Sequence, residues 1–152
     1  ATFNICLPAS GQKAAPEDIR KDEILRGQET ILIVDDERLN ILVTKEILES
    51  LGYNVHTAGS GQEAMAVFME KGKDIDLIIL DMVMPGMGGS RTFDALRKIN
   101  PDISIILASG YTVDGEAQQL LGRGCNGFIQ KPYRIQDLSK KIREVLEKRI
   151  SR

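Results

Sequence analysis

The chain has 152 residues, of which 42% are hydrophobic and 28% are charged, and its formal net charge is −2. This length suits one domain with a sizeable core plus some additional chain, and the composition is typical of a globular protein. The small net charge and scattered basic residues exclude a general nucleic-acid binder, and no apolar run approaches the roughly 20 residues that cross a bilayer, so we expect no membrane contact by this chain.

The two cysteines, Cys6 and Cys125, have neither the spacing of a metal or redox site nor that of a disulfide framework. We therefore expect a reducing, cytoplasmic location for this chain, within a parent chain that could itself be anchored in a membrane. Residues 9–29 are polar and charged and nearly free of core residues, which is typical of a linker. A folded domain is predicted over residues 30–150.

Within this domain, apolar segments that predict strands alternate with segments of helical spacing. The first helical segment carries Leu39, Val43, Ile47 and Leu51, an apolar row at every fourth residue that ends at Gly52. The second begins with a capping box. The predicted strands are 31–34, 53–58, 77–80, 103–108 and 127–130, and the later helical segments are 60–72, 93–99, 117–121 and 135–146.

Five short strands that alternate with five helices predict an α/β fold with a parallel sheet, right-handed crossovers and helices on both faces. A (βα)5 doubly wound sheet with strand order 2-1-3-4-5 is the most economical arrangement. Binding in such sheets occurs outside the carboxyl ends of the strands, where the order switches between the first and third strands.

Polar residues stand at four of these strand ends. Asp35 and Asp36 follow the first strand, Asp81 the third, Ser109 the fourth and Lys131 the fifth. Three crowded carboxylates repel one another, and a hard divalent cation with oxygen ligands, Mg²⁺ above all, would hold them together. With the Lys131 ammonium as a second cation, Asp81 could attack a phosphoryl group and form an acyl phosphate, to which Ser109 would donate a hydrogen bond.

Each of these residues also has a purely structural interpretation. Asp35 and Asp36 could cap the following helix, Asp81 and Ser109 could be turn residues, and Lys131 could be an ordinary surface lysine. Their occurrence together at neighbouring strand ends favours the functional interpretation.

Residues 29–150 resemble the receiver domain of two-component response regulators. The resemblance rests on the motifs ILIVDDE (31–37), LIILDMVMPGMGG (77–89), ILASGY (106–111) and GFIQKP (127–132). It implies a flavodoxin-like fold in which Asp81 accepts a phosphoryl group from a phosphohistidine. It also implies Mg²⁺ ligation by Asp36, Asp81 and the Val83 backbone carbonyl, with Asp35 holding the ion mainly through water.

The same resemblance implies a conformational switch. Ser109 would move toward the phosphoryl group, and the ring of Phe128 would turn inward. A cis peptide bond is implied before Pro132. The implied partner is the dimerisation and phosphotransfer domain of a histidine kinase, or a histidine phosphotransfer protein, and we expect the chain to be a monomer or a weak dimer.

The first eight residues, ATFNICLP, bear a second resemblance, to the closing strand of the ATP-binding domain of histidine kinases. Together with the absence of an initial methionine, this predicts a fragment of a hybrid sensor histidine kinase. Residues 1–8 would be a remnant of the kinase domain, with the receiver at its carboxyl end. The fragment would be a phosphoacceptor rather than a turnover enzyme, whereas its parent would be a histidine protein kinase.

Two other functions compete with this one. A pseudo-receiver that serves only as an interaction module usually lacks an acid or the lysine, and this chain lacks none of them. An aspartyl-nucleophile phosphatase of the haloacid-dehalogenase type is expected to carry a second Asp two residues after the nucleophile. Here that residue is Val83, which counts against turnover.

Overall fold

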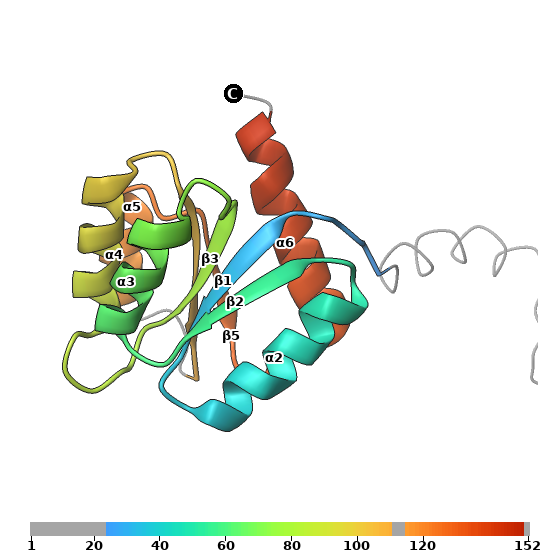
Figure 1. Cartoon of the computed structure of the whole chain (residues 1–152), viewed down its shortest axis with the longest axis horizontal. Helices are drawn as coiled ribbons and strands as arrows, with labels where there is room; N and C mark the ends of the chain where they lie inside the picture. Colours follow the sequence, from blue (N-terminus) through green and yellow to red (C-terminus); the bar gives the residue numbers. More distant parts are fainter. Residues whose placement is uncertain (1–23, 111–114, 151–152) are drawn as a thin grey trace, which may run out of the picture.

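A computed structural model of the protein describes residues 24–110 and 115–150, in which strands and helices alternate along the chain (Figure 1). The strands are β1 (Thr30–Val34), β2 (Asn54–Ala58), β3 (Leu77–Asp81), β4 (Ser104–Ser109) and β5 (Gly127–Gln130). The helices are α2 (Arg38–Ser50), α3 (Gly61–Lys71), α4 (Gly89–Ile99), α5 (Gly115–Gly122) and α6 (Ile135–Ile150). None of these helices combines the length and the apolar character that a membrane span requires.

The five strands form one parallel sheet in the order β2-β1-β3-β4-β5, which confirms the predicted topology. Helices α3, α4 and α5 cover one face of the sheet, and α2 and α6 cover the other (Figure 1). The strand order switches between β1 and β3, so the carboxyl ends of these two strands lie side by side. This is the edge at which a doubly wound sheet binds its ligands.

The apolar runs of the sequence form strands that are buried on both faces. In β1, Leu32 and Val34 belong to the core beneath α3, α4 and α5, whereas Ile31 and Ile33 belong to the core beneath α2 and α6. Every residue of β3 and β4 is buried. Successive side chains of a strand point to opposite faces of the sheet. A strand that is covered on both faces is therefore apolar at nearly every residue.

Helix α3 begins at the predicted capping box. The Ser60 hydroxyl accepts a hydrogen bond from the N–H of Glu63 at 3.0 Å. The Glu63 carboxylate accepts one from the N–H of Gly59, not from that of Ser60. The cap therefore satisfies a backbone donor one residue earlier than the usual pattern, in which the acid bonds the N-cap residue itself.

The first half of the apolar row that the sequence shows in the first helix does not face the core, although Leu51 at the end of the row is buried. Leu39 and Val43 are 71% and 49% exposed, whereas Thr44 and Leu48 are buried. The helix carries apolar residues on more than one side, and a four-residue spacing alone does not decide which side faces the sheet. The exposed apolar residues lie in the first two turns of α2, which is separated from the carboxyl end of β1 by three residues.

Residues 24–29, the part of the predicted linker that the structure describes, contact the domain. The N–H of Gly27 donates to the Leu51 carbonyl at 3.1 Å, at the end of α2. The Glu29 carboxylate accepts two hydrogen bonds from the Arg143 guanidinium of α6, at 2.9 and 2.6 Å. This N-terminal strap therefore joins α2 to α6 across the start of β1.

We expect Glu29→Gln to lower the free energy of unfolding by about 1 kcal/mol. The substitution keeps the shape of the side chain but removes the charge that Arg143 binds, in a pair whose side chains are only 27% and 16% exposed. Glu147→Gln is the matched control, because Glu147 also contacts Arg143, at 3.6 Å, but is 68% exposed. Its effect should stay within about 0.3 kcal/mol. Equal losses for the two variants in urea denaturation would show that the strap contact adds no more stability than the exposed contact of Glu147.

Candidate functional site

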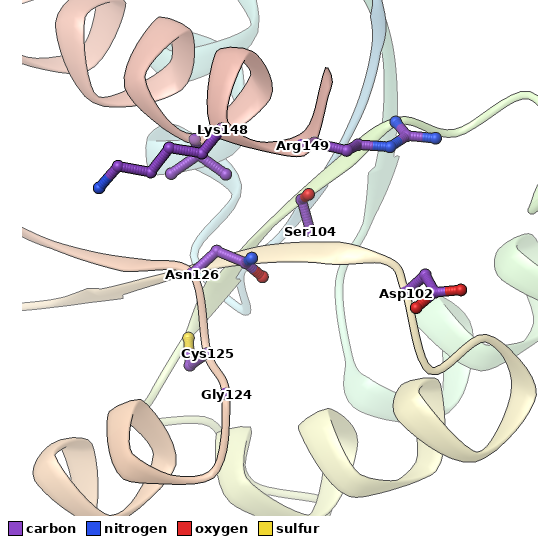
Figure 2. A pocket seen from close by; sticks show the side chains of 8 residues that line it. Asp102, Ser104, Gly124, Cys125, Asn126, Lys148 and Arg149 are labelled. Atoms are coloured by element: carbon purple, nitrogen blue, oxygen red, sulfur yellow. The ribbon is translucent and has the colours of Figure 1, made fainter. Parts of the chain in front are cut away.

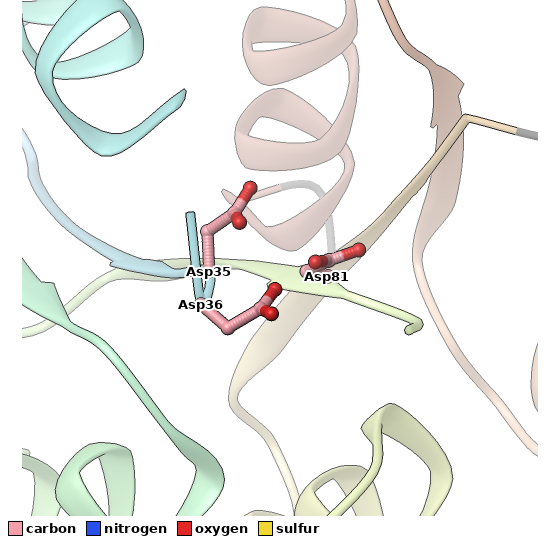
Figure 3. A group of neighbouring side chains, drawn as sticks. All are labelled: Asp35, Asp36 and Asp81. Carbon is pink, nitrogen blue, oxygen red and sulfur yellow. The ribbon is translucent and has the colours of Figure 1, made fainter. Parts of the chain in front are cut away.

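Three aspartates meet at the carboxyl edge of the sheet. Asp35 and Asp36 follow β1, and Asp81 is the last residue of the neighbouring strand β3 (Figure 3). One carboxylate oxygen of each residue lies within 4.8 Å of those of the other two. Asp35 and Asp81 are buried, and Asp36 is exposed. The parallel topology thus gathers side chains that are far apart in the sequence.

The ammonium of Lys131 reaches this cluster from the end of β5. Its Nζ donates a hydrogen bond to Asp35 Oδ2 at 2.7 Å and lies 3.3 Å from Asp81 Oδ1. The three side chains are largely shielded from solvent, which strengthens the attraction between opposite charges. Lys131 therefore neutralises part of the charge of the three carboxylates.

Backbone pairing between neighbouring strands places the remaining polar residues. In the β3–β4 register Asp81 lies opposite Ala108, so Ser109 is one residue further along the same edge. The N–H of Lys131 donates to the Ser109 carbonyl at 2.7 Å, which fixes the lysine next to the end of β4. Ser109 is buried, and the peptide bond between Lys131 and Pro132 is cis.

The loop after Asp81 stays close to the strand end. The N–H of Val83 donates to Asp81 Oδ1 at 3.3 Å. Gly86 has a φ of +75°, which side chains other than glycine rarely adopt. A Cβ at Gly89 would lie 2.7 Å from the Cα of Met82, so only glycine lets α4 begin this close to β3. Ligation of a metal by the Val83 carbonyl stays a prediction.

Burial and neighbouring charges shift the protonation of this cluster. Desolvation raises the pKa of Asp81 from 3.8 to about 6, and the negative charge of Asp35 adds to this effect, while Lys131 opposes it. Burial acts to lower the pKa of Lys131, but its hydrogen bond to Asp35 and the charge of Asp81 raise that pKa above its ordinary value. Lys131 is therefore positively charged at neutral pH, and the ionised form of Asp81 is costly while no further cation is present.

The donor atoms of the cluster suit a hard divalent cation. All three side chains offer carboxylate oxygens, which Mg²⁺ prefers, and the exposed Asp36 leaves the cluster open to solvent. A second cation beside Lys131 would stabilise the ionised form of Asp81, whose pKa is raised by burial and further by the negative charge of Asp35. Such a small ligand set fits Mg²⁺, which keeps several of its waters.

Phe128 lies in β5, level with Leu107 of β4. Its ring is partly buried and packs against the core beneath α3, α4 and α5. This places the predicted switch residue on the face of the sheet opposite α2 and α6. The inward turn of the Phe128 ring stays a prediction. Tyr111, the last residue of the ILASGY motif, lies outside the described residues.

Two residues near the site were not among those predicted. The hydroxyls of Thr44 on α2 and Tyr133, two residues after Lys131, lie 2.6 Å apart and share a hydrogen bond. A threonine in the middle of an otherwise apolar helix side indicates a hydrogen bond to another element, because a buried hydroxyl needs a partner. The spacing of residues in the sequence does not identify that partner.

Two cavities lie at opposite ends of the sheet. One, of about 530 Å³, adjoins Lys131 and is lined on its other side by the exposed start of α2. The other, of about 560 Å³, is lined by Ser104, Cys125 and Arg149 among others (Figure 2). Ser104 begins β4, five residues before Ser109, which is about 16 Å along an extended strand. Of these two cavities, only the first adjoins the candidate site, through Lys131.

Comparisons with known proteins agree with this geometry. The family model of the response regulator receiver domain matches residues 31–143. The chain is 36% identical over 156 residues to the sensor kinase CckA of Brucella abortus (strain 2308), covering 97% of this chain and 16% of that protein. It is 33% identical over 120 residues to the transcriptional regulatory protein CpxR of Escherichia coli (strain K12), covering 78% of this chain and 49% of CpxR. The chain thus spans at most about half the length of these relatives.

Solved structures share the fold. The crystal structure of a response regulator receiver domain protein from Clostridium thermocellum matches with a TM-score of 0.77 and 31% identity, covering 81% of this chain and 98% of that one. The chemotaxis protein CheY4 of Vibrio cholerae matches with a TM-score of 0.74 and 29% identity, covering 79% and 100%. Because the family model covers most of the sequence and solved receiver domains share its architecture, this chain belongs to the response regulator receiver domain family.

Proposed function

We propose that the chain is the phosphoacceptor of a two-component phosphorelay and that Asp81 takes the phosphoryl group from a phosphohistidine. The environment of Asp81 carries this proposal: a buried carboxylate at a strand end, 3.3 Å from an ammonium and within 4.8 Å of two further carboxylates. Buried carboxylates crowded around one ammonium are concentrated at functional sites.

In the proposed reaction, Asp81 attacks through Oδ2, because the contacts with Lys131 and with the Val83 N–H are both made by Oδ1. An O–P bond forms at Asp81 as the N–P bond of the phosphohistidine breaks, and the electron pair of that bond returns to the imidazole nitrogen. Lys131 Nζ neutralises charge on the transferred oxygens. Asp35 holds Lys131 in place through its 2.7 Å hydrogen bond.

We propose that Asp35, Asp36 and Asp81 hold Mg²⁺, together with the Val83 carbonyl. When bound, the ion would neutralise negative charge on the carboxylates and on the phosphoryl oxygens. The transferred group brings roughly −1.5 to −2 charges to the edge of the sheet. We propose that the Ser109 hydroxyl then donates to it and that Phe128 turns inward, which would change the surface around β4 and β5.

The proposed donor is the dimerisation and phosphotransfer domain of a histidine kinase, or a histidine phosphotransfer protein. Leu39, Leu42 and Val43 of α2 are exposed, and two of them line the cavity beside Lys131. An exposed apolar helix surface next to the acceptor suits the docking of a partner helix. Such docking would bring the phosphohistidine of the partner close to Asp81. We propose that the chain itself is a monomer or a weak dimer.

The similarity to CckA, which includes residues before the family match, supports the proposal that this chain is part of a hybrid sensor histidine kinase. Within that proposal, residues 1–8 are a remnant of the kinase domain and 9–29 a linker; residues 1–23 lie outside the described residues. Cys125 is a free, buried thiol, in line with a proposed reducing, cytoplasmic location.

Labelling with acetyl phosphate tests the proposed function. We expect Mg²⁺-dependent incorporation that approaches about one phosphoryl group per chain and then stops. Sustained release of phosphate from several phosphate monoesters would instead support a phosphatase. Absence of labelling, with no change in NMR shifts at millimolar Mg²⁺, would support a pseudo-receiver.

Asp36→Asn is expected to weaken Mg²⁺ binding by about tenfold or more, which corresponds to about 1.4 kcal/mol. It removes one charged ligand at the exposed side of the cluster without disturbing the buried pair of Asp35 and Lys131. Titration of Mg²⁺ followed by amide NMR shifts measures the change. Glu37→Gln removes an exposed charge from the adjacent residue and should keep the affinity within about twofold; similar losses in both variants would point to a diffuse charge effect rather than to a ligand.

A further inference from the structure

The hydrogen bond between Thr44 and Tyr133 joins two segments of the site. Thr44 lies in the middle of α2 and is 3% exposed. Tyr133 lies in the short loop between β5 and α6, and its ring packs against the core beneath α2 and α6. Their hydroxyl oxygens are 2.6 Å apart, although the residues are separated by 89 positions in the sequence.

Each partner is close in the chain to a charged residue of the site. Helix α2 follows Asp35 and Asp36 after its N-cap residue Glu37, whose N–H donates to Asp35 Oδ1 at 2.9 Å. Tyr133 follows Lys131 by two residues. The hydrogen bond therefore braces the segment that follows the aspartates against the loop that follows the lysine.

The loop that carries Lys131 is held at several described points besides the contacts of the Lys131 ammonium with Asp35 and Asp81. At one end the N–H of Lys131 bonds the Ser109 carbonyl, and at the other end α6 begins at Ile135. Between these points the Tyr133 hydroxyl is attached to α2. Burial raises the pKa of Tyr133 above its ordinary value, so its hydroxyl stays neutral at physiological pH and keeps this bond.

We infer that Tyr133 is a positioning residue for phosphoryl transfer: through its bond to Thr44 it holds the Lys131 ammonium where the incoming phosphoryl group must be neutralised. The inference rests on the proposed function of Asp81 and adds Tyr133 and Thr44 to the residues that support phosphoryl transfer. Displacements of about an ångström in such a group reduce rates strongly, by up to about 100-fold. Because Lys131 keeps its own bonds to Asp35 and Asp81, we expect a smaller loss here.

The test compares the rates of Mg²⁺-dependent labelling by acetyl phosphate. Tyr133→Phe and Thr44→Val each remove one hydroxyl and should lower the maximal rate about fivefold to tenfold, with the Mg²⁺ affinity within about twofold of wild type. The double variant should lose no more than either single variant, because both break one bond. Thr44→Ser keeps the hydroxyl and should keep the wild-type rate.

Tyr53→Phe is the matched control. It removes another buried tyrosine hydroxyl, which lies beside Arg143 rather than Lys131, and it should also leave the labelling rate unchanged.

A second readout does not depend on labelling. In metal-free protein, the backbone amide and Nζ NMR signals of Lys131 should shift in Tyr133→Phe and Thr44→Val and stay in place in Tyr53→Phe. Unchanged Lys131 signals, additive rate losses, or wild-type rates in both single variants would overturn the positioning role. If wild-type protein is not labelled at all, the proposed function fails, while the Lys131 signals still decide whether the hydroxyl pair positions the lysine.

Discussion

Asp81→Asn is expected to abolish Mg²⁺-dependent labelling by acetyl phosphate, lowering it by at least about 100-fold. The amide has nearly the shape of the carboxylate but cannot form the acyl phosphate. The backbone and the pair formed by Lys131 and Asp35 should stay in place, because Lys131 makes its shorter contact with Asp35, at 2.7 Å. The incorporated label, measured per chain under saturating Mg²⁺, reports the result.

Asp102→Asn is the matched control for this experiment. It makes the same chemical change at an exposed aspartate that lines the cavity at the other end of β4. We expect its labelling to equal that of the wild type. Equal labelling of the Asp81 variant and the control would show that another residue accepts the phosphoryl group.

The same substitution should stabilise the metal-free protein. We expect Asp81→Asn to raise the free energy of unfolding at pH 7.5 by about 1–3 kcal/mol. The upper limit follows from the rise in the pKa of Asp81 from 3.8 to about 6 in the folded protein, because each pKa unit corresponds to about 1.4 kcal/mol. The Asp81 side chain is only 8% exposed, so solvent screening reduces this cost little.

The direction of the pH dependence follows from the raised pKa. The folded protein favours the protonated form of Asp81, so the contribution of Asp81 to stability is complete below about pH 3.8 and is lost as the pH rises through about 6. The stability difference between Asp81→Asn and wild type should therefore grow between pH 5 and pH 7.5. Urea denaturation without metal at these two pH values measures it. If Asp81→Asn is less stable than the wild type at pH 7.5, the claim that the ionised Asp81 carboxylate destabilises the folded protein is refuted.

The sheet and the aspartate cluster could be predicted because their signals are local in the sequence. Residues 77–80 form a continuous apolar run that ends on Asp81, and residues 31–34 form another that ends on Asp35. Since the carboxyl ends of parallel strands share one edge, polar residues at four of the five strand ends are enough to locate the site. The topology then brings Asp35 and Lys131 within 2.7 Å without further information from the sequence.

Contacts between side chains of different elements could not be predicted in this way. The rotation of α2 about its axis, which buries Thr44 and exposes Leu39, is set by packing against the sheet and not by spacing. The bond between Thr44 and Tyr133 depends on that rotation and on the path of a loop. The pair of Glu29 and Arg143 likewise depends on how the strap crosses α6, in a segment whose composition is typical of a linker.

The identity of the labelled residue tests the central claim most directly. After labelling with acetyl phosphate and Mg²⁺, borohydride reduction converts an aspartyl phosphate into homoserine, which tandem mass spectrometry locates in the sequence. We predict that this conversion occurs at Asp81. Conversion at Asp35 or Asp36, or labelled protein in which Asp81 is unmodified, would contradict the proposal that this strand-end carboxylate is the phosphoacceptor.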